Sequence, residues 1–187
     1  MGKTAITFVL AALAASAAAA EPPAWRVDGD ASRLGFEGTQ GGSAFEGSFE
    51  RFEAEVHFDE ADLENSSVRV DVDVTSAEAG AVERTQQLPS VTWFDTSNFP
   101  NAVYEATGFE RLEDNRYRAA GTLSLKGISR EVPLTFTIAI DGGRAVAEGR
   151  AELVRTEFDV GTGEFTSGSL VGLDVAVLFR IEADREG

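Results

Sequence analysis

The sequence predicts an all-β domain, either a barrel or a sandwich of antiparallel strands. Three observations predict it: apolar and polar residues alternate in long runs after Trp25, turn signals separate these runs, and one stretch alone favours a helix. Alternation with a period of two is typical of strands that bury one face. An open sheet of this length would leave its edges exposed, which favours a sheet that curls or closes.

Residues 1–20 have the pattern of a secretory signal peptide. Lys3 precedes an apolar stretch from Ala5 to Leu13, and small residues end at Ala20 before Glu21. A charged start, an apolar centre and an A-x-A end are the marks of a cleaved export signal. We therefore expect residues 1–20 to be removed and residues 21–187 to form one domain in the periplasm.

The strand signals follow one another along the mature chain. Alternating runs cover residues 52–58, 68–74, 132–140 and 175–181, and turn signals such as Asp28-Gly29-Asp30 and Asp141-Gly142-Gly143 fall between such runs. Ser76 to Leu88 breaks the pattern, because it is rich in Ala, Glu, Gln and Arg and is followed by Pro89. This composition predicts a short helix near residues 81–88.

The stretch "GTLSLKGISREVPLTF", Gly121 to Phe136, predicts a β-hairpin. Leu123 and Leu125 face inward, the chain turns at residues 126–129, and the apolar alternation resumes at Val132. Lys126 is the only lysine after residue 20. We expect it at the surface or at a rim, with no set of partners around it that would make a catalytic lysine.

Composition excludes several classes of function. The chain has no cysteine, so disulfides and thiolate chemistry are absent, and its net charge of −16 argues against nucleic acid and general membrane-surface binding. His57 is the only histidine, flanked on its strand face by Glu55 and Asp59, where a weak metal site or a solvated polar face are both open. No serine stands in a G-x-S-x-G motif, and we expect no enzyme.

Four stretches, in order, resemble the YceI-like family of bacterial secreted proteins. They are "WRVDGDASRLGFEGTQ" from Trp25, "WFDTSNFPNAVYEAT" from Trp93, the hairpin from Gly121, and "VRTEFDVG" from Val154. The resemblance implies a lipocalin-like antiparallel barrel of about eight strands, with a hydrophobic interior that holds a polyisoprenoid in some relatives. Relatives often carry Arg-Asp where this chain has Arg84-Thr85.

The resemblance leaves two functional hypotheses. In the first, the barrel sequesters or carries an isoprenoid lipid or isoprenoid quinone, with no other cofactor and no metal. In the second, it is a packed acidic module that serves a membrane redox system with b-type cytochromes, or a stress response. The protein is a monomer or a homodimer in either case.

The predicted ligand-binding residues are the inward positions of the strands with the clearest alternation, together with aromatic residues near the predicted helix. They are Phe36, Phe49, Val56, Phe58, Val70, Val72, Trp93, Phe94, Phe99, Leu123, Leu125, Phe136, Ile138, Phe158, Val175 and Val177. Arg84 and Arg155 are candidates for a headgroup, because a guanidinium matches phosphate oxygens, although a structural ion pair with a neighbouring carboxylate is equally open.

Overall fold

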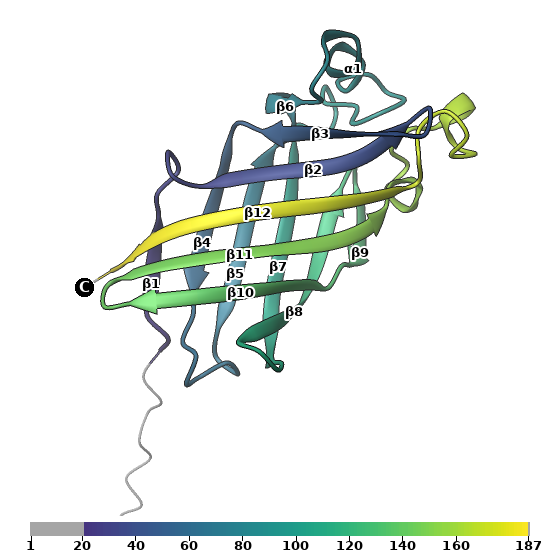
Figure 1. The fold of residues 1–187 in the computed structure, drawn as a ribbon. Coiled ribbons are helices and arrows are strands. Elements are labelled where there is room, and N and C mark those ends of the chain that lie inside the picture. The colour runs from purple at the N-terminus through teal and green to yellow at the C-terminus, as the bar shows by residue number, and fades with distance from the viewer. Residues whose placement is uncertain (1–20, 187) are drawn as a thin grey trace, which may run out of the picture.

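Eight antiparallel strands close into a barrel in the computed structural model, which describes residues 21–186 (Figure 1). Each strand pairs with the next, and β1 closes the ring by pairing with both β4 and β12. The predicted lipocalin-like barrel is confirmed, whereas the expected signal peptide, residues 1–20, lies outside the described residues. In ring order the strands are β1 (Ala24–Val27), β4 (Phe52–His57), β5 (Ser67–Asp73), β7 (Asn101–Arg111), β8 (Arg116–Leu125), β10 (Leu134–Asp141), β11 (Arg144–Val154) and β12 (Asp174–Arg185).

Three more strands extend one side of the ring. β12 pairs with β1 near its C-terminus and with β2 (Arg33–Gln40) nearer its start, β2 pairs with β3 (Ser43–Phe49), and β3 pairs with β6 (Ala77–Glu78). The chain therefore bends between β1 and β2 and again between β3 and β4. In Figure 1 the layer of β2, β12, β11 and β10 crosses in front of β4, β5 and β7.

Helical structure is short and lies outside the barrel wall. α1 spans Val82–Gln87, with Ala81 and Leu88 as its caps, which confirms the helix predicted near residues 81–88. Three 3₁₀ turns, η1 (Val74–Ser76), η2 (Arg155–Phe158) and η3 (Gly163–Phe165), bridge strand ends. Within residues 21–186 no helix has the length and hydropathy that a membrane crossing requires.

The hairpin from Gly121 folds as its alternation predicts, with a tighter turn. β8 and β9 (Ile128–Glu131) are joined by Lys126 and Gly127 alone, whose φ angles are 51° and 76°. Positive φ at both central residues is the hallmark of the turn that suits hairpin twist. Lys126 does not stand free at this turn: its Nζ donates to the backbone carbonyls of Val91 and Asp159, both at 2.7 Å.

Connections alternate between the two ends of the barrel. α1, the β2–β3 turn and the β11–β12 connection, residues 155–173, lie at one end, which we call the α1 end (Figure 1). The β4–β5, β7–β8 and β10–β11 connections lie at the opposite end, which we call the far end. Each end has its own buried cluster of apolar side chains.

Candidate functional site

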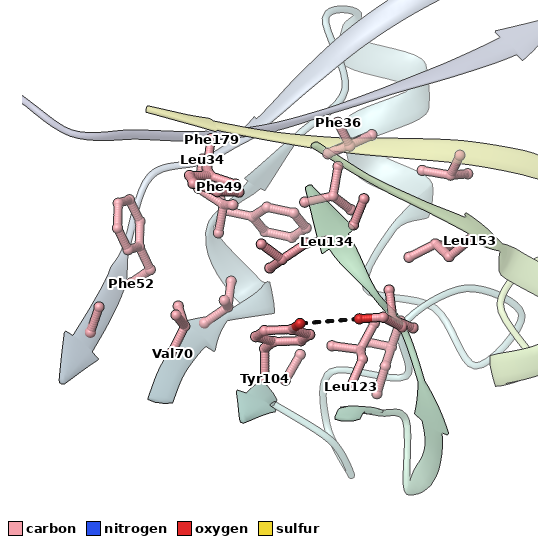
Figure 2. Close-up of a pocket in the computed structure, with 18 of the residues that line it drawn as sticks. Leu34, Phe36, Phe49, Phe52, Val70, Tyr104, Leu123, Leu134, Leu153 and Phe179 are labelled. Carbon is pink, nitrogen blue, oxygen red and sulfur yellow. Dashed lines mark hydrogen bonds between the residues drawn. The ribbon is translucent and has the colours of Figure 1, made fainter. Parts of the chain in front are cut away.

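A cavity of about 320 Å³ occupies the interior of the barrel, and its lining is almost wholly apolar. All eight strands of the ring contribute to it, because alternate residues of each strand point inward. Figure 2 shows Phe36, Phe49, Leu134 and Phe179 around this space. Its volume is at the small end of the range of about 300–1,000 Å³ for ligand pockets.

The predicted ligand-binding residues are largely brought together around this cavity. Those in its lining are Phe36, Phe49, Val56, Phe58, Val70, Val72, Trp93, Phe94, Leu123, Leu125, Phe136, Ile138, Val175 and Val177, with both headgroup candidates. Phe99 and Phe158 lie outside the lining. Phe158 is fully buried in η2, and Phe99 packs against Gly127 in the β8–β9 turn. Neither belongs to a strand, so a period of two does not set the direction of its side chain.

Sequence reasoning missed several lining residues that the same alternation could have found. Leu134 stands between Val132 and Phe136 on one face, and Phe179 follows Val175 and Val177. Others on the inner faces of the strands are Leu34, Phe45, Phe52, Tyr104, Phe109 and Leu153. Small residues at Ala102, Ala147 and Ala151 also line the cavity, and they carried no signal because alanine is common on either face.

Glycines let aromatic rings lie along the wall instead of filling the centre. A Cβ built on Gly47 would be 2.2 Å from the ring of Phe36, and one on Gly121 would be 2.1 Å from the hydroxyl of Tyr104. Because each ring covers a glycine of a neighbouring strand, its bulk lies over backbone. This arrangement keeps a space open inside a barrel whose wall is rich in phenylalanine.

Aromatic side chains fill the far end. The rings of Tyr117 and Phe136 stack with centroids 5.4 Å apart, and Phe58 meets Tyr117 edge-on at 5.7 Å. The indole Nε1 of Trp25 donates to the carbonyl of Phe58 at 2.9 Å. Burial, reinforced by the neighbouring Glu60 carboxylate, raises the pKa of Tyr117 to about 12. These contacts close the cavity at the far end.

At the α1 end the cavity reaches the surface, since Gln40 and Gln87 line it and are exposed. Arg84 lies between them: its Nε donates to the carbonyl of Ala79 at 2.8 Å and its Nη1 to Oε1 of Gln40 at 3.1 Å. The guanidinium lies 4.6 Å above the ring of Phe45. Within residues 21–186 its Nη2 has no hydrogen-bond partner, so this nitrogen can donate to a ligand.

Arg155, the second headgroup candidate, has its donors committed to the protein. The side chain is 3% exposed, and its five N–H groups donate at 2.5–2.9 Å to carbonyls of the β11–β12 connection, those of Val160, Gly161, Phe165, Val171 and Gly172. A guanidinium has five such donors, so none is left for a headgroup. The alternative ion pair is also absent among the described residues. Burial lowers the pKa of Arg155.

Thr85 fills the position at which relatives often carry Asp. Its Oγ1 accepts from the backbone N–H of Ala79 at 3.0 Å and donates to Oε2 of Glu78 at 3.1 Å. The hydroxyl therefore links α1 to the strand before it and leaves Arg84 as the charged group at the mouth.

The described residues contain no cluster of His, Cys, Asp or Glu that could hold a metal ion. His57 ends β4 with an exposed side chain, and among the described residues it does not group with Glu55 and Asp59 into a set that could hold a metal ion. Polar side chains along the cavity donate hydrogen bonds to backbone carbonyls: Arg84 at the mouth to that of Ala79, and Tyr104 in the wall to that of Val132. The arrangement is suited to enclosing an apolar molecule.

Comparison with known proteins identifies a family with this fold. The model of the YceI-like domain matches residues 25–183, which span the barrel from β1 to β12. The chain belongs to the YceI-like family.

Solved structures agree with the fold. The crystal structure of Burkholderia cenocepacia BcnA is 30% identical, with a TM-score of 0.80 over 84% of this chain and 99% of that one. A polyisoprenoid binding domain from Saccharophagus degradans, described as implicated in plant cell wall breakdown, has a TM-score of 0.66 at 17% identity, over 88% of this chain and 99% of that one. At that identity the likeness shows the fold alone.

Curated relatives match shorter parts of the chain. A UPF0312 protein of Azotobacter vinelandii is 27% identical over 61% of this chain and 62% of its own length. One from Photorhabdus laumondii is 27% identical over 75% of this chain and 74% of its own length. The chain thus spans about three fifths of the first of these relatives.

Proposed function

We propose that this YceI-like protein binds an isoprenoid lipid or isoprenoid quinone in the periplasm, with the prenyl chain in the barrel and the polar head at Arg84. The apolar cavity, closed by aromatic rings at the far end and reaching the surface at the α1 end, carries this proposal. The name of the Saccharophagus degradans domain supports the ligand class, and the pattern of residues 1–20 supports the compartment.

Burial of the prenyl chain supplies the affinity. At about 0.8 kcal/mol per CH₂, one five-carbon unit contributes up to about 4 kcal/mol before ordering costs. A cavity of about 320 Å³ encloses only part of a long prenyl chain. We therefore expect affinity to rise over the first few units and then to level off.

Recovery of bound lipid from purified protein tests the proposal. We expect organic extraction and mass spectrometry to yield a recurring prenyl species. Ala147 lines the cavity and Ala139 is exposed on the paired strand β10, so Ala147→Leu should lower the recovery about tenfold, whereas Ala139→Leu should not change it. Wild-type protein repeatedly recovered without lipid would favour the alternative of a packed module that serves a redox or stress system.

A second experiment tests whether the headgroup binds at Arg84. Charge-assisted hydrogen bonds contribute about 1.5–3 kcal/mol, so Arg84→Gln should weaken binding of a prenyl phosphate about tenfold or more. For an uncharged quinone of equal prenyl length the same variant should lose less affinity, because a hydrogen bond to a neutral carbonyl contributes only about 0.5–1.5 kcal/mol. Equal losses for both ligands would place the head away from Arg84.

A further inference from the structure

Three segments at the α1 end contain no charged residue. They are residues 38–45, 85–94 and 165–173, "GTQGGSAF", "TQQLPSVTWF" and "FTSGSLVGL". Charged residues make up 26% of the chain and its net charge is −16, so three such stretches at one place depart strongly from the rest of the molecule.

Hydrogen bonds and ring contacts join these segments around the mouth of the cavity. The N–H of Gly41 donates to the carbonyl of Leu170 at 3.0 Å, and that of Gly172 to the carbonyl of Thr39 at 2.8 Å. The rings of Trp93 and Phe165, both in the cavity lining, lie 5.1 Å apart. We call these three segments the uncharged rim.

The uncharged rim also carries exposed aliphatic side chains. Val91 is 71% exposed and Leu170 is 47% exposed, and Val82, at the start of the adjoining helix α1, is 66% exposed. Within residues 21–186 these are all the large hydrophobic side chains that are exposed. Isolated exposed aliphatics are ordinary, but their confinement to one end beside the mouth indicates a contact surface.

The far end has the opposite character. The β4–β5 connection alone carries Asp59, Glu60, Asp62 and Glu64, and the β7–β8 turn carries Glu113 and Asp114. An anionic surface is repelled by the far end, whereas the uncharged rim adds no charge that would oppose contact with a surface of low net charge. The net charge argues against membrane binding by the whole surface. Because Glu83 and Glu164 also lie at the α1 end, the local exception is the uncharged rim and not the whole end.

We propose that the uncharged rim docks onto the surface of a phospholipid bilayer of low net charge, with Val82, Val91 and Leu170 inserted among the headgroups. A basic protein partner would be matched by carboxylates, and the uncharged rim has none. A second copy would bring two chains of charge −16 together mouth to mouth. Trp93, whose indole has an apolar body and a polar N–H, suits the membrane interface.

Docking of this kind places the mouth of the cavity against the membrane. It goes beyond ligand binding, since the uncharged rim can meet a bilayer whether or not the barrel holds a ligand. The two properties can therefore be measured separately.

Flotation with phosphatidylcholine vesicles tests the docking proposal on lipid-extracted protein. We expect wild type to float with the vesicles and to do so equally well at high salt, because the contact is apolar. Burying an aliphatic side chain contributes enough for about a tenfold change in affinity, so Val91→Glu and Leu170→Glu should each reduce the bound fraction accordingly. Ala61→Glu, at an exposed position of the far end, should float like wild type.

Three results would overturn the proposal. Wild type could fail to float, the two rim variants could float like Ala61→Glu, or sedimentation could show a dimer that Val91→Glu abolishes, which would make a second copy the occupant. Quenching by brominated phosphatidylcholine gives an independent readout: Trp93 at the uncharged rim should be quenched, and buried Trp25 at the far end should not. Recovery of prenyl lipid from Val91→Glu should match wild type, which separates a docking defect from a binding defect.

Discussion

Arg155 organises the connection that borders the cavity mouth. Its guanidinium holds five backbone carbonyls of the β11–β12 connection, and it lies 5.4 Å from the centre of the Trp93 ring. Replacement by methionine would leave these carbonyls without a donor. Each buried unpaired group costs about 1–3 kcal/mol, so we expect Arg155→Met to lower the free energy of unfolding by about 3 kcal/mol or more in chemical denaturation.

Arg155→Lys separates the geometry of the guanidinium from its charge. An ammonium has three donors in a compact tetrahedron and cannot reach five carbonyls, so this variant should also be clearly less stable than wild type. Wild-type stability of the lysine variant would show that the charge alone is sufficient. Arg84→Lys is the matched control, because Arg84 is half-buried and makes only two hydrogen bonds to the protein.

The roles of single cations were the least predictable part of the sequence. Lys126 binds backbone carbonyls of two segments distant along the chain, and Arg155 binds those of its own connection; in both cases the acceptors are carbonyls, which carry no sequence signal. Arg84 differs, because it stands in a helix that the composition predicts, next to the cavity mouth. Its place at the site could therefore be inferred, whereas the binding of Arg155 could not.

Among the elements, the hairpin of β10 and β11 depends on a glycine. A Cβ at position 149 would lie 2.5 Å from Cζ of Phe179, 2.6 Å from Cβ of Phe136 and 2.6 Å from the carbonyl oxygen of Thr135. Because the backbone cannot give way as a side chain can, we expect Gly149→Ala to destabilise the protein by about 1–3 kcal/mol, measured by urea denaturation.

Gly108→Ala provides the comparison within β7. The nearest atom to a Cβ there is Cβ of Ala120 at 3.5 Å, an ordinary contact. Replacing glycine where the backbone permits it stabilises by up to about 1 kcal/mol, so this variant should be neutral or more stable. Similar losses at both positions would mean that the cost arises from backbone conformation and not from the packing of Phe179.

Strand positions followed from alternation, but their bends did not. The runs at 52–58, 68–74 and 132–140 correspond to β4, β5 and β10 with small shifts at their ends. The break between β1 and β2 arises because β12 must pair with both in turn. β3 and β4 separate in the same way, because β3 pairs with β2 and β4 pairs with β1. This pairing is a consequence of closing the ring, so it cannot be predicted from any local sequence pattern.

At the scale of the whole molecule, composition could not decide between a packed and a hollow barrel. The same phenylalanines would serve either interior. What keeps the barrel hollow is pairs such as Gly47 with Phe36 and Gly121 with Tyr104. In each pair the glycine lacks a side chain, so the aromatic ring from the adjacent strand can lie flat over its backbone. Such pairs depend on register, which the closed structure supplies.

The two tyrosines of the chain report on how well the barrel excludes water. Tyr104 lines the cavity and donates to the carbonyl of Val132 at 3.1 Å, and Tyr117 is fully buried at the far end and donates to Glu60. Burial raises the pKa of both hydroxyls, that of Tyr117 to about 12. A raised pKa means that the folded state keeps the proton. The resulting stabilisation is fully present below about pH 10 and is lost as the pH rises through about 12.

Titration of tyrosinate absorbance should therefore show almost no ionisation of the native protein at about pH 10, where the chain in denaturant is half ionised. Ionisation should coincide with loss of the β-sheet circular dichroism signal, because the hydroxyls gain access to water when the barrel opens. Tyr117→Phe, which leaves Tyr104 alone, should halve the amplitude and keep the late onset. Reversible ionisation of the wild type near pH 10 with an intact β-sheet signal would contradict this, because it would mean that water already reaches the interior. A hydrated interior would also remove the apolar driving force on which ligand binding depends.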